Sequence, residues 1–197
     1  VGFVAHKATL GLLAKIGTDM RFALEIDALD GGLDALALSW QASRNIALTV
    51  GARDVPYGRS AMRSSAELPF LSHALGAGAL SFGDRLGLTA EGNYYEGKHG
   101  WLMGVYNGTE GLGGNRNGGL VFGGRFEAAP LGRLAKRVPT ALRIAVGAGG
   151  LLADGPSVDT LALSADLTLE KSGVRLFAEA LQDTRTPDAQ PVLAGTL

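Results

Sequence analysis

The sequence contains no cysteine, which excludes a disulfide framework and a thiolate metal site. It has no apolar run of the ~18 residues that a transmembrane helix requires. Its charges nearly cancel, with 18 Lys and Arg against 19 Asp and Glu, and no basic patch is visible, which argues against a nucleic-acid partner. A membrane β-barrel stays open as an interpretation, because its signal is alternation in segments of ~10 residues.

Glycine, by contrast, is abundant: 30 of 197 residues, about twice the usual ~7%. Because glycine weakens strands in a soluble core, this abundance indicates a curved sheet or a barrel. The sequence begins at Val1 with neither Met nor a signal peptide, so we expect either a processed mature chain or a segment of a longer one.

Apolar and polar residues alternate over most of the chain, which is typical of antiparallel strands. The pattern predicts about ten strands, at residues 7–16, 20–28, 33–41, 45–53, 85–94, 99–106, 119–128, 141–151, 159–170 and 173–181. The connections after the first, third, fifth and ninth strands are short, and those after the fourth and sixth are long. This is how barrels with tight periplasmic turns and long outer loops are built, although the connection 129–140 is longer than the scheme predicts.

We therefore predict an all-β fold, a transmembrane antiparallel up-and-down β-barrel. A soluble β-sandwich has nearly the same pattern, since its apolar faces point at each other instead of at lipid. The barrel is favoured by the uncharged apolar faces, by the alternating loop lengths and by aromatic residues near strand ends. These aromatic residues are Trp40, Tyr94, Tyr95, Trp101 and Tyr106.

One long stretch, residues 53–83, lacks the alternation. It turns at Pro56 and Gly58, and Ala61 to Gly76 then holds helix formers and apolar residues that suit a buried loop better than a solvated tip. We expect a single β-barrel domain over 1–197, with 53–83 as an inserted constriction-type loop that contains a short helix. Its apolar side chains would pack against the inner wall or a neighbouring chain: Met62, Leu68, Phe70, Leu71 and Leu75.

Several segments are similar to those of a known family. They are GFVAHKATLGLLAKIG as an opening strand, MRFALEIDA as its return strand, VGARDVPYGRSAMRSSAELPFL with its Pro-aromatic-Gly turn, and GVYNGTE before a loop. Together, over the first 110 residues or so, they resemble the phosphate-selective porin O and P family of bacterial outer membranes. The resemblance implies an outer-membrane diffusion channel, a loop folded into the lumen and a homotrimer.

The sequence departs from that family in two respects. The family builds barrels of more than ten strands, and outer-membrane barrels commonly end on an aromatic residue, whereas this sequence ends PVLAGTL. The chain is then either a segment of a longer barrel or a reduced relative whose first and tenth strands pair, with help from residues 189–197. Members that select phosphate are also expected to carry a ladder of Arg and Lys along the pore.

The face predicted to line the lumen is instead of mixed charge, which argues against strong anion selectivity. Its cations are Lys7, Lys15, Arg21, Arg53, Arg85, Arg125, Arg143 and Arg175, and its anions are Glu25, Asp27, Glu91, Glu127, Asp166, Glu170 and Glu179. With Arg59 and Arg63 from the inserted loop, these are the predicted pore-lining residues. A ring of Arg53, Arg59 and Arg63 would select anions, but pairing with Asp54, Glu67 or lumen carboxylates is the favoured reading.

No catalytic, metal or cofactor site is predicted. His6, His73 and His99 lack metal-ligand spacing. Ser72 and His73 are neighbours in the sequence, but this alone does not give them the geometry of a catalytic pair. The glycine run 111–119 has no phosphate-loop pattern and reads as a mobile outer loop.

The leading hypothesis is a porin-like channel for passive diffusion of small polar or ionic solutes across the bacterial outer membrane. The alternative is a small barrel filled by its own side chains and loop, which serves as an anchor or subunit of an envelope complex. Strand number distinguishes the two, because barrels of ~8 strands are filled whereas those of ~16 leave an aqueous channel. A soluble sandwich is the third and weaker reading.

Overall fold

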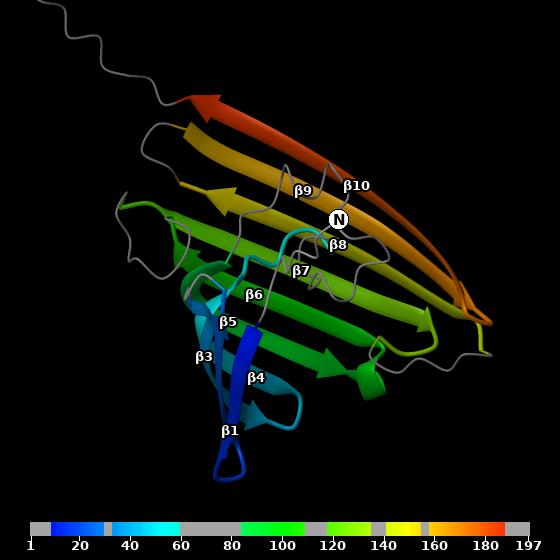
Figure 1. The fold of residues 1–197 in the computed structure, drawn as a ribbon. Helices are drawn as coiled ribbons and strands as arrows, with labels where there is room; N and C mark the ends of the chain where they lie inside the picture. The colour runs from blue at the N-terminus through cyan, green and yellow to red at the C-terminus, as the bar shows by residue number, and fades with distance from the viewer. Residues whose placement is uncertain are drawn as a thin grey trace, which may run out of the picture.

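The computed structural model describes residues 9–29, 33–59, 84–108, 118–134, 141–154 and 158–187. Ten strands form one sheet in chain order, and each pairs antiparallel with the next (Figure 1). The strands are β1 (Thr9–Ile16), β2 (Met20–Asp27), β3 (Leu33–Ser43), β4 (Ile46–Asp54), β5 (Asp84–Tyr94), β6 (His99–Asn107), β7 (Leu120–Leu131), β8 (Arg143–Ala153), β9 (Val158–Lys171) and β10 (Val174–Pro187). The up-and-down, all-β architecture predicted from the alternation is confirmed.

The alternation also sorts the two faces of the sheet, most clearly in β9. Ala162, Ser164 and Thr168 are buried on the face over which residues 55–59 lie, which we call the inner face. Leu161 and Leu163 on the opposite, outer face are 45% and 50% exposed. Side chains of a strand alternate between its two faces, so Asp166 and Glu170, the charged residues of β9 between 160 and 170, both lie on the inner face.

Among the described residues, most of the outer face is apolar and exposed. Large side chains of five middle and late strands are exposed there: Val50, Leu88, Met103, Phe122, Phe126 and Leu152. A sandwich would bury this face against a second sheet. So wide an apolar surface is instead what a membrane barrel presents to lipid.

The sheet curves but is open between its first and last strands (Figure 1). Among the described residues no pairing joins β1 to β10, so the pairing considered for a reduced relative is not present there. The segment 189–197, which that pairing would have used, lies outside the described residues, as do 60–83 and with them the expected short helix and its apolar side chains.

Two predicted strands, β7 and β10, end three or more residues later than their alternation indicates. β10 continues past Leu181 to Pro187, where Asp183 and Arg185 still pair with residues of β9. These last residues are polar on both faces, so the backbone pairing leaves no alternation in the sequence. β7 likewise continues to Leu131 through a register shift after Ala128.

The connections confirm the short turns after the odd strands β1, β3, β5 and β9. The turn after β5 contains the short 3-10 segment η2 (Tyr95–Gly97), in which Tyr95 and Glu96 adopt positive φ angles of 51° and 58°. In the described part of the chain, no helix is long and apolar enough to cross a membrane.

Tyr106, one of the five aromatic residues near strand ends, is only 1% exposed and lies on the inner face. Position in the strand alone does not reveal this, because a tyrosine suits both an interface belt and a buried cluster.

Candidate functional site

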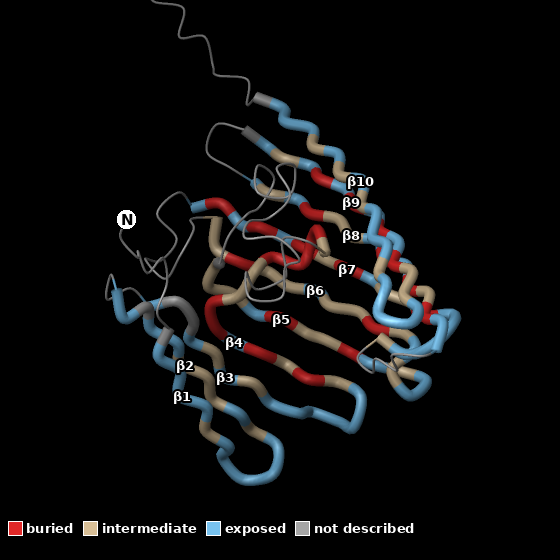
Figure 2. Tube along the Cα trace, turned by 45° about the vertical axis from the view of Figure 1, so that its right-hand side comes forward, coloured by how far each residue is buried: buried red, intermediate tan, exposed pale blue. Residues whose placement is uncertain are grey.

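Residues 55–59, which we call the crossing segment, leave the end of β4 and lie across the inner face of the middle strands. Val55, Pro56, Tyr57 and Gly58 are all buried. Figure 2 shows the buried residues gathered on this segment and on the strands beneath it, whereas β1 and β2 are mostly exposed or intermediate. The first part of the predicted inserted loop therefore folds inward.

Three inner-face glycines make room for this segment and its contacts. A Cβ on Gly123 would lie 2.6 Å from Val55 Cγ1, and one on Gly149 would lie 2.2 Å from the carbonyl oxygen of Tyr57. A Cβ on Gly147 would lie 2.1 Å from Arg125 Nη2. Glycine is required most strictly at Gly149, where the close atom belongs to the backbone, whereas Gly123 and Gly147 are approached by the side chains of Val55 and Arg125.

An apolar cluster packs the crossing segment against the inner face of the sheet. Val55 and Tyr57 pack with Tyr106, Val121 and Leu151, which come from β6, β7 and β8. Burial of such side chains contributes about 1.5–3 kcal/mol for each large one. The sequence offered no signal for this cluster, because its members lie on the face that otherwise carries the charges.

Tyr57 also makes four hydrogen bonds that join the crossing segment to β7, β9 and β10. Its hydroxyl donates to the carbonyl oxygens of Leu163 (3.0 Å) and Gln182 (3.2 Å). Its own carbonyl accepts from Ser164 Oγ at 2.7 Å and Arg125 Nη1 at 3.4 Å. Burial raises the pKa of the Tyr57 hydroxyl, and Asp183 and Glu179 raise it further, so the neutral donor is maintained.

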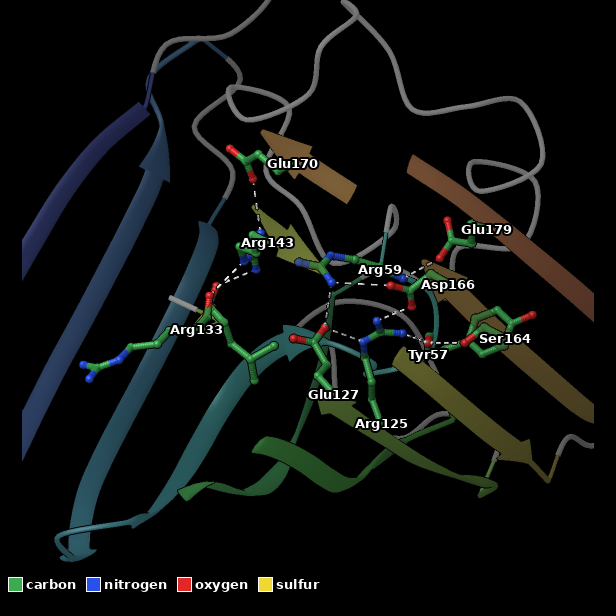
Figure 3. A network of polar contacts seen from close by, with 11 residues as sticks. Tyr57, Arg59, Arg125, Glu127, Arg133, Arg143, Ser164, Asp166, Glu170 and Glu179 are labelled. Atoms are coloured by element: carbon green, nitrogen blue, oxygen red, sulfur yellow. Dashed lines mark hydrogen bonds and ion pairs between the residues drawn. The ribbon is translucent and has the colours of Figure 1, made fainter. Parts of the chain in front are cut away.

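Beside Tyr57 lies a set of five charged residues, which we call the central cluster: Arg59, Arg125, Glu127, Asp166 and Glu179 (Figure 3). Arg125 donates from Nε to Glu127 Oε1 at 2.8 Å and from Nη2 to Asp166 Oδ2. The side chains of Arg125 and Asp166 are 2% and 0% exposed. A buried carboxylate of this kind is stable only while its partners remain.

Arg59 extends the central cluster from the crossing segment. Its Nη1 lies 3.4 Å from Asp166 Oδ1 and 3.8 Å from Glu127 Oε1, and its backbone N–H donates to Glu179 Oε1 at 2.6 Å. The cluster thus ties the crossing segment to β7, β9 and β10. Two arginines face three carboxylates, so the cluster is acidic by one charge.

A second group of paired charges lies near the turn ends of β8–β10. Arg143 Nη1 and Arg175 Nη2 lie 3.3 Å and 3.4 Å from the same oxygen of Glu170. Arg143 also donates to the carbonyl oxygens of Arg133 and Leu134, each at 2.8 Å, which holds the chain after β7 (Figure 3).

The other predicted residues are scattered around the inner face. Arg53 pairs with Glu91 at 3.6 Å, and Arg85 donates to the carbonyl oxygens of Asn107 and Gly108. Together with the contacts of Arg59, this shows Arg53 and Arg59 each beside carboxylates of the same face. Arg63, the third member of the predicted ring, lies outside the described residues.

The charged residues of β1 and β2 stand apart from the central cluster. Lys15 lies directly opposite Arg21, and Glu25 lies opposite Gly11. Asp27 ends β2 in register with Thr9. The structure therefore brings together the predicted residues of β7, β9 and β10 but not those of the first two strands.

Histidine supports no metal site in the described part of the chain, where no group of three or more metal-binding side chains is found. His99 lies against the rings of Tyr95 and Phe126, with centroids 5.3 Å and 6.2 Å away. His6 and His73 lie outside the described residues.

Comparison with protein families matches residues 2–137 to phosphate-selective porin O and P. The chain belongs to this family. The family consists of porins, which are passive channels of the bacterial outer membrane, so the family indicates a channel as the function class. Comparisons with curated proteins and with solved structures gave no match.

The porin match covers β1 to β7 and the crossing segment. It includes Arg59, Arg125 and Glu127 of the central cluster, while Asp166 and Glu179 lie beyond it. Tyr57 is a residue of this site that is absent from the predicted pore-lining set. It lies in the Pro-aromatic-Gly turn on which the resemblance to the family rests. An aromatic residue between two turn residues was the feature of the sequence that could have identified it.

Proposed function

We propose that the chain forms a porin channel for small polar or ionic solutes, restricted by the inserted loop 53–83 and only weakly selective for charge. The crossing segment carries this proposal, because it lies over the inner face and would narrow the path beside it. The predicted pore-lining residues Arg59, Arg125 and Asp166 stand where the segment meets the wall.

Weak charge selectivity follows from the pairing of the charges. Arg53, Arg59, Arg125, Arg143 and Arg175 each have a carboxylate within 4 Å. The fields of two opposite charges largely cancel at distances greater than the separation within the pair, and salt screens the remainder over a Debye length of ~8 Å at physiological ionic strength. A phosphate-selective path would need cations that no carboxylate neutralises.

A second function, a filled structural barrel that serves as an envelope anchor, is supported by a separate observation. Besides the crossing segment, Leu134 lies over the inner face, where a Cβ on Gly100 would be 3.1 Å from Leu134 Cδ1. If the inserted loop fills the remaining space, no path is left for solutes.

Liposome swelling separates these two functions. Vesicles that contain the purified chain are diluted into isotonic solutions of neutral sugars of increasing size. The channel predicts fast swelling with the smallest sugar and a steep loss of rate as size increases. No swelling with any sugar, from vesicles in which the chain is inserted and protease-protected, contradicts the channel and supports the filled barrel.

A further inference from the structure

A cavity of about 300 Å³ lies on the inner face between β5, β6 and β7, beside the central cluster. Its polar lining is Glu91, Asn93, Arg125 and Glu127, and its apolar lining includes Leu102 and Leu134. Small-molecule sites combine a mostly apolar wall with a few polar groups in this way, and this volume is at the lower end of their usual range.

The floor of the cavity exists because β6 carries a glycine there. In the sheet register Gly100 lies between Asn93 of β5 and Glu127 of β7, so β6 itself places no side chain between these two polar groups, and Leu134 Cδ1 lies over the glycine. The next inner-face residue of β6, Leu102, lies between Glu91 and Arg125 and provides an apolar surface.

The roof is Leu134, and several contacts keep it in place. Its backbone N–H donates to the carbonyl oxygen of Gly97 at 2.8 Å, and its carbonyl accepts from Arg143 Nη2 at 2.8 Å. The preceding residue, Arg133, forms an ion pair with Glu96. The cavity is therefore formed by the fold itself, before any solute enters.

The charges of the lining favour a cation. Arg125 is 2% exposed and already donates to Glu127, Asp166 and the carbonyl oxygen of Tyr57. Glu91 is 39% exposed and pairs with Arg53 over 3.6 Å, and such exposed pairs contribute at most about 1 kcal/mol. An entering ammonium group can replace Arg53 at Glu91 at little cost, whereas an anion would meet two carboxylates.

We propose that this cavity is a transit site for small organic cations with a short alkyl chain. The ammonium group, which has three donors, is received by the carboxylates of Glu91 and Glu127 and the side-chain oxygen of Asn93. The alkyl chain lies between Leu102 and Leu134. This inference rests on the proposed channel only for how the solute arrives, and it contrasts with the phosphate for which the family is named.

The test is calorimetric titration of the detergent-solubilised chain with butylammonium at low salt, with butyrate as the matched anion. Butylammonium is expected to bind and butyrate is not. Glu91→Gln should weaken butylammonium binding by roughly tenfold, the effect of one lost charge-assisted hydrogen bond. Glu25→Gln, which removes an exposed carboxylate from β2 on the same face, should change nothing.

Other results overturn the inference. Equal binding of both ions, no binding of either, or equal weakening by Glu91→Gln and Glu25→Gln each contradicts a site for cations at this cavity. Butylammonium binding does not require conduction. Binding without liposome swelling would therefore support the cation site and contradict the proposed channel. Liposome swelling without butylammonium binding would contradict the cation site only.

Discussion

At Gly149 the absence of one methyl group decides whether the crossing segment can lie on the sheet. The neighbouring Gly150 is on the outer face, where a Cβ would meet Leu163 Cδ2 at an ordinary 3.5 Å. The sequence alone cannot distinguish the two glycines. Gly149 is needed because the carbonyl oxygen of Tyr57, a residue 92 positions earlier in the chain, lies against it.

Gly149→Ala should therefore displace the crossing segment, while Gly150→Ala serves as the matched control. Crowding of this kind costs about 1–3 kcal/mol. We expect a lower unfolding temperature for Gly149→Ala and faster cleavage by trypsin after Arg59, with Gly150→Ala like the wild type. The same behaviour in both variants would show that Tyr57 does not approach the strand as described.

Asp166 is the most buried carboxylate of the central cluster: it contacts both arginines, as Glu127 does, and its side chain is 0% exposed. Asp166→Asn removes one of the two carboxylates that contact Arg125, which keeps its pair with Glu127, and we expect a loss of about 1.5–3 kcal/mol in the free energy of unfolding. Urea unfolding in detergent measures it. Asp159→Asn, an exposed position of the same strand, is the control, and an equal small effect in both variants would contradict the described pairing.

At the scale of elements, the sequence predicts where the strands are and which side chains lie on each face of the sheet, because alternation directly reports which side of a strand is apolar. The inner-face assignments of β7, β8 and β9 follow from it. The pairing of Arg59 with Asp166 could not be predicted, since it joins a segment without alternation to a strand 107 residues away.

The position of the crossing segment also makes a prediction about alkaline pH. The pKa of Tyr57 is raised in the folded chain, so its contribution to stability is fully present below the ordinary tyrosine pKa of ~10 and is lost as the pH rises from there through the folded value. Wild-type stability should thus fall more steeply above pH ~10 than that of Tyr57→Phe. Parallel curves for the two proteins would place Tyr57 in solvent.

At the scale of the whole molecule, the described part of the ten-stranded sheet has a largely apolar outer face and an inner face on which Arg53, Arg59, Arg125, Arg143 and Arg175 pair with carboxylates. The mixed charge and the pairing of arginines with lumen carboxylates follow from composition and alternation, but the specific partners do not, because register and segment position decide which opposite charges meet. That pairing is what separates a weakly selective path from a phosphate-selective one.

The most direct test is single-channel recording of the purified chain in a planar bilayer under a potassium chloride gradient. The account predicts stable open steps and a reversal potential close to zero, with a small displacement in the direction of cation preference because the central cluster is acidic by one charge. A reversal potential near the limit for chloride would contradict the charge-paired pore. Silence from the correctly inserted chain would contradict the channel itself.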